Sequence, residues 1–460
     1  PTHKAMAALI YYEFTAGLMK TKPEELTISV VGLGYVGLPT ALALHKAGFE
    51  VYGVDISEDV IETLKGGGSP FVDESSELII PVDSESWNVT CDFGEAIPKS
   101  DIVLITVPTP VTESNEPDLS FVISASRSIL QSVNTNSRTI VTLESTVYPG
   151  VTRKELGAIC EELGLTQNEE VFLAYSPERV SPGESNRTVD SVARIVGCDS
   201  REVGELLSGI YSLITKAGST YVGSIEVAEA SKLIENVQRD IDLAFVNELS
   251  TILPQIGIDV EEVLDAASTK WNFHRHTPGI GVGGHCIPVD PYFYISLSQG
   301  VGSETKLGLA ARKMNESMPE KSFLMISQLL EREGITAKKA LVLGFSYKSE
   351  TGDSRETPVR ELTELLSTSG VETFVWDPYV DPLEFPDWVT SVESPVDEKG
   401  FDLVVLATAH EACVSIDWEN LHSLCNNHAL FDGRRALMPS KMKDIGWIYH
   451  GVGYPLGANP

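Results

Sequence analysis

The chain has 460 residues, of which 42% are hydrophobic and 22% charged, a composition typical of a globular protein rather than a disordered one. At roughly 150 residues per domain, this length predicts about three domains. The 66 acidic and 34 basic residues give a net charge of −32, which repels nucleic acids and anionic membranes, so neither is an expected partner. No apolar run approaches the roughly 20 residues of a membrane helix.

The first 26 residues contain one short apolar stretch, at positions 5–12. We expect them to form a short N-terminal helix or extension rather than a signal peptide, because no clear small-residue cleavage site follows. The six cysteines, at positions 91, 160, 198, 286, 413 and 425, are widely spread and form no CxxC pair. This spacing favours reduced thiols and predicts a cytoplasmic protein.

From residue 26 the chain alternates between apolar segments, glycine turns and segments with helical spacing. We predict strands within residues 26–34, 49–56, 101–108, 138–146 and 169–178, with a helix at 35–48. Strands separated by helices predict a parallel sheet with helical crossovers. This block ends near Val222.

A long helical segment follows, at residues 224–253. Ser224 is a suitable N-cap, and Pro254 and Gly257 end the segment. About 30 residues exceeds the usual length of a globular helix, so we expect it to connect two domains. One apolar face at helical spacing predicts a dimer interface. It is formed by Leu233, Val237, Ile241, Ala244 and Phe245.

A second alternating block begins near Lys338. Strands are predicted within 338–348, 371–380, 401–410 and 427–435, a helix at 357–370, and a surface loop at 382–400. The predicted fold class is α/β, with two Rossmann-like, doubly wound parallel-sheet domains joined by a long central helix. The predicted boundaries are an extension at 1–26, a first sheet domain at 27–222, a central helical domain at 223–325 and a second sheet domain at 326–460.

The first motif is Gly32-Leu-Gly34-Tyr-Val-Gly37, between a strand and a helix. Its glycines permit a tight turn, close approach of a pyrophosphate and close packing of the helix on the strand. Asp55 ends the next strand, 23 residues after Gly32, where a carboxylate accepts both ribose hydroxyls and repels a 2′-phosphate. The motif predicts NAD as the cofactor. The alternative is a glycine turn that binds no ligand.

The second motif is the glycine-rich segment at 278–291, which contains His285, Cys286 and Asp290. A thiolate there can attack an aldehyde carbon, and Asp290 can orient the thiol or a water molecule. One alternative is a buried structural cysteine. Another is a zinc site with His274 and His276, which we do not favour because no second ligand pair is apparent.

Two further groups of polar residues stand at positions typical of ligand sites. Lys232 and Asn236 share one face of the long helix, where they could stabilise an oxyanion. Glu144 and Glu178 follow predicted strands, at the strand ends where α/β sheets bind ligands. The alternatives are a solvent-facing lysine with an unimportant asparagine, and acids that serve as structural ion-pair partners.

The loop after the first strand of the second block contains Lys348, Asp353 and Arg355. Two cations at a strand end suit a diphosphate group. The alternative is a solvated charged loop.

Taken together, the motifs resemble the nucleotide-sugar 6-dehydrogenases of the UDP-glucose/GDP-mannose dehydrogenase type, from about Ile28 to the C-terminus. The matching motifs are GLGYVG at 32–37, the acid at Asp55, VPTP at 107–110, ESTVYPG at 144–150, YSPERVSPG at 175–183, EASKLIENVQRD at 229–240, GVGGHCIPVDP at 281–291 and GFSYKSETGDSRETP at 344–358.

The resemblance implies an N-terminal NAD domain, a central helix that pairs two subunits, and a C-terminal domain that binds UDP-sugar. It implies oxidation of a C6 alcohol to a carboxylate with two NAD in turn. Cys286 would form a thiohemiacetal and then a thioester, Lys232 and Asn236 would stabilise the oxyanion, and Asp290 would assist proton transfer.

The resemblance also implies the remaining site residues. Thr146 and Glu178 would order the catalytic water. The cofactor contacts would be Gly32, Gly34, Tyr35, Val36, Gly37, Asp55, Pro108, Thr109 and Thr146. The substrate contacts would be Glu178, Arg179, Val180, Lys232, Asn236, Arg275, Gly283, Lys348 and Arg355. No metal is implied.

One departure from the family pattern bears on the substrate. Members that act on UDP-glucose carry an acid four residues after the glutamate at 178, where this chain has Pro182. The segment resembles the branch that acts on UDP-N-acetylhexosamines, and residues 269–279 favour the N-acetylglucosamine enzymes of capsule synthesis. The alternatives are the N-acetylmannosamine, UDP-glucose and GDP-mannose enzymes, a two-electron hydroxy-acid dehydrogenase and a non-catalytic nucleotide sensor.

Overall fold

The computed structural model describes residues 25–71, 78–179 and 189–456. The chain divides into two compact units, and neither is continuous in sequence. The first unit comprises Pro1–Glu235 and Tyr292–Ser303, and the second comprises Asn236–Pro291 and Glu304–Pro460. Residues 1–24 of the predicted N-terminal extension and the positions of Val180 and Pro182 lie outside the described residues.

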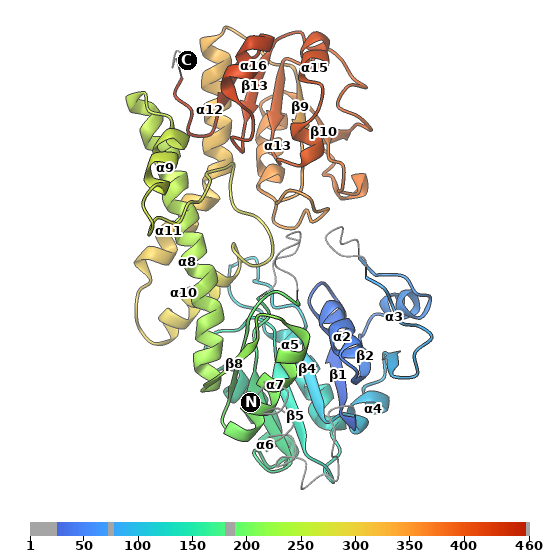
Figure 1. Ribbon diagram of the computed structural model, residues 1–460. Coiled ribbons are helices and arrows are strands. Elements are labelled where there is room, and N and C mark those ends of the chain that lie inside the picture. The colour runs from blue at the N-terminus through green and yellow to red at the C-terminus, as the bar shows by residue number, and fades with distance from the viewer. Residues whose placement is uncertain (1–24, 72–77, 180–188, 457–460) are drawn as a thin grey trace. The chain divides into compact units, whose positions relative to one another are not determined.

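The first unit is built on an eight-stranded sheet with the order β3-β2-β1-β4-β5-β6-β7-β8 (Figure 1). Neighbouring strands are parallel except β6 and β7, which pair antiparallel with Tyr175 opposite Gly197. The strands are β1 (Thr27–Val31), β2 (Glu50–Val54), β3 (Trp87–Thr90), β4 (Ile102–Ile105), β5 (Thr139–Leu143), β6 (Val171–Tyr175), β7 (Arg194–Cys198) and β8 (Ser219–Gly223).

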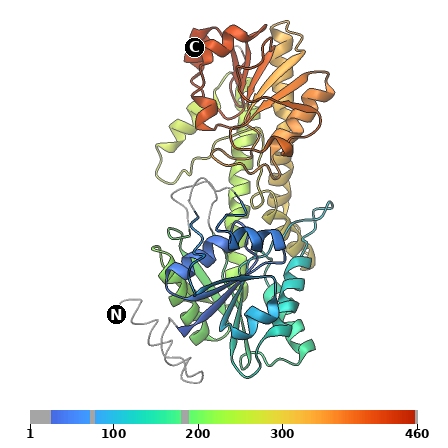
Figure 2. The same ribbon diagram turned by 90° about the vertical axis from the view of Figure 1, so that its right-hand side faces the viewer.

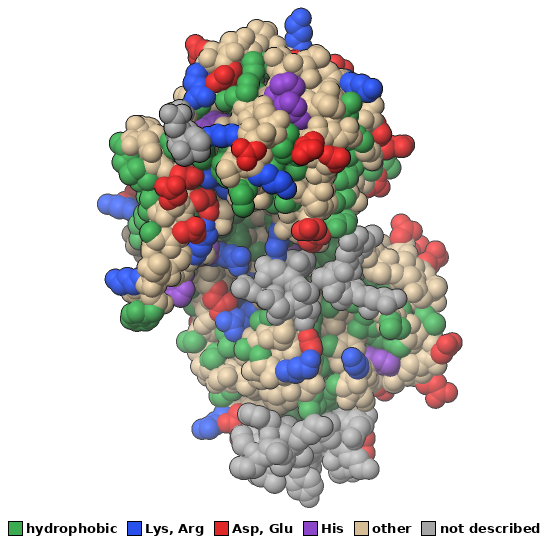
Figure 3. Space-filling model, turned by 45° about the horizontal axis from the view of Figure 1, so that its top comes forward, with side chains coloured by type: hydrophobic (Ala, Val, Ile, Leu, Met, Phe, Trp, Pro, Cys, Tyr) green, Lys and Arg blue, Asp and Glu red, His purple; other side chains and the backbone are tan. Residues whose placement is uncertain are grey.

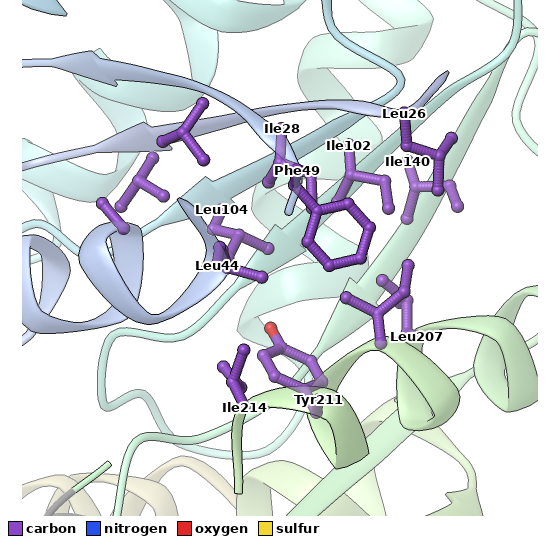
Figure 4. Close-up of a cluster of buried hydrophobic side chains, with 14 of the residues drawn as sticks. Leu26, Ile28, Leu44, Phe49, Ile102, Leu104, Ile140, Leu207, Tyr211 and Ile214 are labelled. Carbon is purple, nitrogen blue, oxygen red and sulfur yellow. The ribbon is translucent and has the colours of Figure 1, made fainter. Parts of the chain in front are cut away.

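Helices cover both faces of this sheet (Figure 2). They are α2 (Gly37–Lys46), α3 (Glu58–Lys65), α4 (Phe93–Ala96), α5 (Ser120–Ser132), α6 (Gly157–Leu163) and α7 (Arg201–Ile214), with short helical turns at Ile97–Lys99 and Thr152–Leu156. Because side chains alternate along a strand, neighbouring residues enter two different cores. Ile28 and Val30 pack with α2, α3 and α7, as Figure 4 shows for part of this cluster, whereas Val31 packs with α4, α5 and α6.

The predicted long helix is confirmed as α8 (Ile225–Ile252). The Ser224 hydroxyl accepts a hydrogen bond from the Glu226 backbone N–H at 3.1 Å, as expected of an N-cap. A 3₁₀ turn (Leu253–Ile256) and Gly257, with φ +76°, end it. The helices that follow are α9 (Val260–Ser268), α10 (Asp290–Gly300), α11 (Lys306–Glu316) and α12 (Met318–Arg332).

The apolar face of α8 that was predicted to form a dimer interface is largely buried within the protein itself. Leu233, Val237 and Ala244 are buried, so they offer no surface to a second copy. Other apolar side chains of α8 are exposed. They are Val227, Ile234, Phe245 and Ile252.

The second unit contains a six-stranded, all-parallel sheet with the order β11-β10-β9-β12-β13-β14. Its strands are β9 (Lys339–Leu343), β10 (Glu372–Trp376), β11 (Val389–Ser391), β12 (Leu403–Leu406), β13 (Ala429–Asp432) and β14 (Ile448–Gly451). Its helices are α13 (Pro358–Thr368), α14 (Glu411–Val414), α15 (Trp418–Leu424) and α16 (Pro439–Ile445), with a 3₁₀ turn at Pro382–Glu384. Here too the two faces bury separate cores, with α12 and α13 on one and α14, α15 and α16 on the other.

Several strands were missed by the sequence patterns. The interpretation of 382–400 as loop is wrong for Val389–Ser391, which form the edge strand β11. The strands β3, β7, β8 and β14 were not predicted either. β3, β8, β11 and β14 are edge strands and β7 lies next to an edge. Segments of three to five residues that mix apolar with polar or glycine positions do not stand out in a periodicity pattern.

Acidic side chains are scattered among basic ones on the face drawn in Figure 3 rather than collected in one area. Within the described residues, no helix is long and apolar enough to cross a membrane.

Candidate active site

The glycine turn after β1 has the geometry that its sequence predicts. Gly32 has φ +95°, a conformation that favours glycine, and its N–H donates to the Val54 carbonyl at 2.8 Å. A Cβ added at Gly37 would lie 1.8 Å from the Gly32 oxygen and 2.4 Å from Thr106 Oγ1. The first turn of α2 therefore approaches β1 as closely as only a glycine permits.

The middle glycine and the acid at the end of β2 fit a bound dinucleotide. A Cβ at Gly34 would meet no heavy atom within 4 Å, so this backbone faces open space that a pyrophosphate could fill. Asp55 accepts hydrogen bonds from Leu33 N–H at 2.8 Å and Ser57 N–H at 2.9 Å, one on each carboxylate oxygen. Each oxygen keeps a lone pair for a ribose hydroxyl.

The other expected cofactor residues lie on this turn or after neighbouring strands. Tyr35 stacks on Phe71, with ring centroids 4.2 Å apart. Pro108 and Thr109 follow β4, and Thr146 follows β5. Because β1, β4 and β5 are parallel neighbours, their carboxyl ends meet at one edge of the sheet.

Both acids predicted at strand ends contact a buried arginine, Arg194, which the sequence patterns did not single out. Arg194 on β7 is 2% exposed, and its Nη1 lies 3.0 Å from Glu144 Oε2. Its Nη2 pairs with Glu178 and contacts the Thr40 hydroxyl at 3.3 Å. The Tyr211 hydroxyl donates to Glu144 Oε1 at 2.5 Å.

This buried network sets the charge states of its members. Burial raises the pKa of Glu144, although the Arg194 charge opposes the rise. Burial would lower the pKa of Arg194, but the charges of Glu178 and Glu144 outweigh it and raise the pKa. Arg194 therefore stays a cation between the two acids, which supports the structural ion-pair interpretation of Glu144 and fixes Glu178 in place.

The first turns of α8 are tied to the loop after β5. Glu229 accepts hydrogen bonds from Gly150 N–H at 2.6 Å and Thr152 N–H at 2.9 Å. Lys232, one turn further on, is buried rather than solvent-facing. Arg179 pairs with Glu235 on the same helix at 2.5 Å, so this expected substrate residue also holds α8.

In the second unit, two predicted catalytic residues are in direct contact. Asn236 on α8 donates through Nδ2 to Asp290 Oδ2, although 54 positions separate them in the chain. Asp290 is 2% exposed and begins α10. The Cys286 carbonyl accepts hydrogen bonds from Val289 N–H at 3.1 Å and Asp290 N–H at 2.8 Å, so a tight turn presents the half-buried thiol just before α10.

The glycines before Cys286 pack against the chain itself. A Cβ at Gly283 would lie 2.6 Å from both the Glu356 carbonyl oxygen and Tyr347 Cβ. Gly284 has φ +92° and donates its N–H to the Arg355 carbonyl at 3.2 Å. At these two positions the requirement for glycine comes from the loop after β9, which brings the cysteine loop and the predicted diphosphate loop together.

The arginines predicted for substrate binding, Arg179, Arg275 and Arg355, have acidic partners. Arg355 Nη2 lies 2.5 Å from Asp353 Oδ2, and this pairing holds the pKa of Asp353 below its usual range despite burial. Arg275 pairs with Glu261 on α9 and lies 3.2 Å from Asp265. Among the described residues, no three His, Cys, Asp or Glu side chains are arranged to hold a metal ion.

The two α/β units, the glycine turn with Asp55, and the contact of Asn236 with Asp290 beside Cys286 together define a nucleotide-binding dehydrogenase. Family models agree with this class along most of the chain. The NAD-binding domain of the UDP-glucose/GDP-mannose dehydrogenase family matches residues 26–215, its central domain residues 226–317 and its UDP-binding domain residues 341–439. The chain belongs to the UDP-glucose/GDP-mannose dehydrogenase family, and is an NAD-dependent enzyme of that family.

Individual relatives match this chain over nearly their whole length. The chain is 36% identical to UDP-N-acetyl-D-glucosamine 6-dehydrogenase of Pseudomonas aeruginosa, over 91% of this chain and 99% of that protein. It is 33% identical to UDP-N-acetyl-D-mannosamine dehydrogenase of Pyrococcus horikoshii, over 93% and 99%. The solved structure of UDP-D-ManNAc dehydrogenase from Pyrococcus horikoshii has a TM-score of 0.83 at 31% identity, covering 93% of this chain and 99% of that one.

Proposed function

We propose that the protein oxidises the C6 alcohol of a UDP-N-acetylhexosamine to a carboxylate and so makes a uronate for surface polysaccharide or glycan synthesis. Relatives named for UDP-N-acetylglucosamine and UDP-N-acetylmannosamine support this substrate class. We favour the glucosamine epimer, since the relative of that name is 36% identical and the mannosamine one 33%. NAD supplies the hydride acceptor in both oxidation steps.

The first oxidation requires the C6 hydroxyl to lose a proton as hydride leaves the carbon. The buried carboxylate of Asp290 takes that proton, and its hydrogen bond from Asn236 fixes the orientation of the carboxylate. The ammonium group of Lys232, buried on α8, stabilises the negative charge that develops on oxygen. The product of this step is an aldehyde.

The second oxidation requires the aldehyde to be held as a tetrahedral adduct. The Cys286 thiolate adds to the aldehyde carbon, and the oxygen takes up a proton, which gives a thiohemiacetal. Loss of that proton and of a second hydride from the same carbon gives a thioester. Lys232 again stabilises the oxygen anion.

Water completes the reaction by attacking the thioester, which releases the carboxylate and returns the thiol. Thr146 and Glu178 are the residues that we assign to ordering this water. The ion pair with Arg194 holds the Glu178 carboxylate in a fixed position, so it needs little reorganisation when the water binds. We also propose a cytoplasmic homodimer, formed through apolar side chains that α8 exposes, such as Ile234 and Phe245.

The observation that carries the proposal is the contact of Asn236 with Asp290 directly after the turn that presents Cys286. A panel of UDP-N-acetylglucosamine, UDP-N-acetylmannosamine, UDP-N-acetylgalactosamine and UDP-glucose, with NADH counted per sugar, tests it. We expect two NADH per sugar and fastest turnover of UDP-N-acetylglucosamine. One NADH per sugar would refute the four-electron mechanism, and preference for the mannosamine epimer would refute the substrate assignment alone.

A further inference from the structure

Around its first strand, β9, the second sheet has the same strand order as the first sheet has around β1. In each unit the first strand lies between the second and fourth strands in chain order, as β2-β1-β4 and as β10-β9-β12. A glycine with positive φ follows the first strand in both, Gly32 at +95° and Gly344 at +86°. Each glycine N–H donates at 2.8 Å to the last residue of the second strand, Val54 or Trp376.

The acid after the second strand is repeated as well. In the first unit, Asp55 accepts the Leu33 N–H at 2.8 Å. In the second unit, Asp377 accepts the Phe345 N–H at 2.6 Å. The two carboxylates therefore occupy the same corner of their sheets, but the Asp377 side chain is fully buried, whereas Asp55 is partly exposed.

The group that covers Asp377 is His410, from the segment that follows β12. His410 is fully buried, and its Nε2 lies 3.1 Å from Asp377 Oδ2 and 3.0 Å from the Ser346 hydroxyl. Its Nδ1 accepts the Glu350 N–H at 3.0 Å, so the ring proton is on Nε2 and faces the carboxylate. Burial would raise the pKa of Asp377, but the hydrogen bonds from His410 and the backbone N–H groups hold it at about 2.

The same imidazole holds both ends of a short loop, residues 346–350. Ser346 contacts one ring nitrogen, and its hydroxyl donates to the Lys348 carbonyl at 2.8 Å. The backbone N–H of Glu350 donates to the other ring nitrogen. Glu350 has φ +58°, a strained value for a residue with a side chain. The Glu350 carboxylate also accepts the Tyr379 hydroxyl at 2.8 Å. Lys348 thus lies in a loop whose backbone is fixed on both sides.

We propose that His410 is a positioning residue for nucleotide binding: it fills the corner that the first unit leaves open for a ribose, and it holds the 346–350 loop so that Lys348 faces a uridine diphosphate. This inference rests on the proposed function only in assigning Lys348 to the diphosphate. The carboxylate at this corner thus organises a loop in the second unit instead of binding a ribose.

The test compares three variants at position 410 by titration with UDP alone and by the KM values for UDP-sugar and for NAD. His410→Leu removes both nitrogens and should weaken UDP binding about tenfold, since an ordering hydrogen bond is lost at each end of the loop. His410→Asn places an amide oxygen near the position of Nδ1 and should restore most of the affinity. His410→Gln places its amide one carbon further out, near the position of Nε2 and away from the Glu350 N–H, and should bind UDP less well than His410→Asn. The KM for NAD should stay unchanged in all three.

Asp402→Ala is the matched control. Asp402 accepts the Lys338 and Lys339 N–H groups at 2.8 and 3.2 Å, and it precedes β12, at the opposite end of this strand from His410. Asp402→Ala should lower the unfolding temperature and leave UDP binding intact.

Wild-type affinity for UDP in His410→Leu would overturn the inference, and so would an equal loss of UDP binding in Asp402→Ala. If His410→Leu does not fold, equal UDP affinities of His410→Asn and His410→Gln would overturn it. Failure of the wild-type protein to bind UDP would instead refute the proposed function, and this inference with it.

Discussion

Replacing Arg194 by methionine tests the buried network at the ends of β5 and β6. The substitution removes the positive charge that pairs with Glu144 and Glu178 and leaves these two acids together in a buried site. Removing one partner of a buried ion pair costs about 3–5 kcal/mol. For a unit of this size, each kcal/mol lowers the unfolding temperature by about 2–4 °C, so a loss of about 10 °C is expected.

Arg153 offers a matched control, because it also pairs with two acids, Asp199 and Glu226, but its side chain is 46% exposed. Water screens such a pair, so Arg153→Met should cost less than about 1 kcal/mol. Calorimetry measures both variants, and the transition that NAD raises is assigned to the first unit, since a ligand stabilises the unit that binds it.

A second substitution tests the physical cause. If the uncompensated acids are responsible, adding Glu144→Gln to Arg194→Met should recover part of the lost stability, because one buried charge is removed. Equal effects of Arg194→Met and Arg153→Met would refute the reasoning. Turnover adds a further readout, since Arg194→Met should slow thioester hydrolysis as Glu178 loses its fixed position.

Three further predictions concern other parts of the molecule. Cys286→Ser should retain NAD and sugar-nucleotide binding but lose carboxylate production, and Cys286→Ala should form no covalent adduct by intact mass; full four-electron turnover by Cys286→Ala would rule out the thioester. Asp55→Ala should weaken NAD use and relax the exclusion of NADP, which steady-state kinetics with both cofactors would measure; unchanged selectivity would contradict this. Burial, with Arg332 and Arg435 nearby, lowers the pKa of His450 to about 4, so the unfolded chain binds a proton more readily below pH 6.5. Stability is therefore lost as pH falls from about 6.5 to 4, and His450→Leu should lose about 2 kcal/mol less than wild type between pH 7 and pH 5 in urea titrations; identical pH dependences would refute this.

Features encoded within one short segment were predictable from the sequence. The glycine turn at 32–37 needs only the strand before it and the helix after it, and the Ser224 cap needs only the residues of one helical turn. Such features depend on local sterics and local hydrogen bonds, which residue identity and spacing determine.

Features that depend on distant partners were not predictable. Arg194 lies 50 positions from Glu144, and no periodicity marks a charged residue at the start of a short strand as a buried cation. The resemblance named both Asn236 and Asp290, but their hydrogen bond exists only because the fold brings α8 and α10 together. Gly283 was identified from the sequence, but only the structure shows that it packs against the loop after β9.

Because neither unit is continuous in sequence, the two units are difficult to separate or recombine. The peptide crosses from one unit to the other three times, after residues 235, 291 and 303, and the returning piece contributes Phe293, which is fully buried near Tyr148. No single cut in the gene can therefore release either half as an intact folding module. A chimera with one junction at residue 235 should therefore be destabilised, because the relative's counterpart of residues 292–303 would have to pack into the NAD-binding half of this chain.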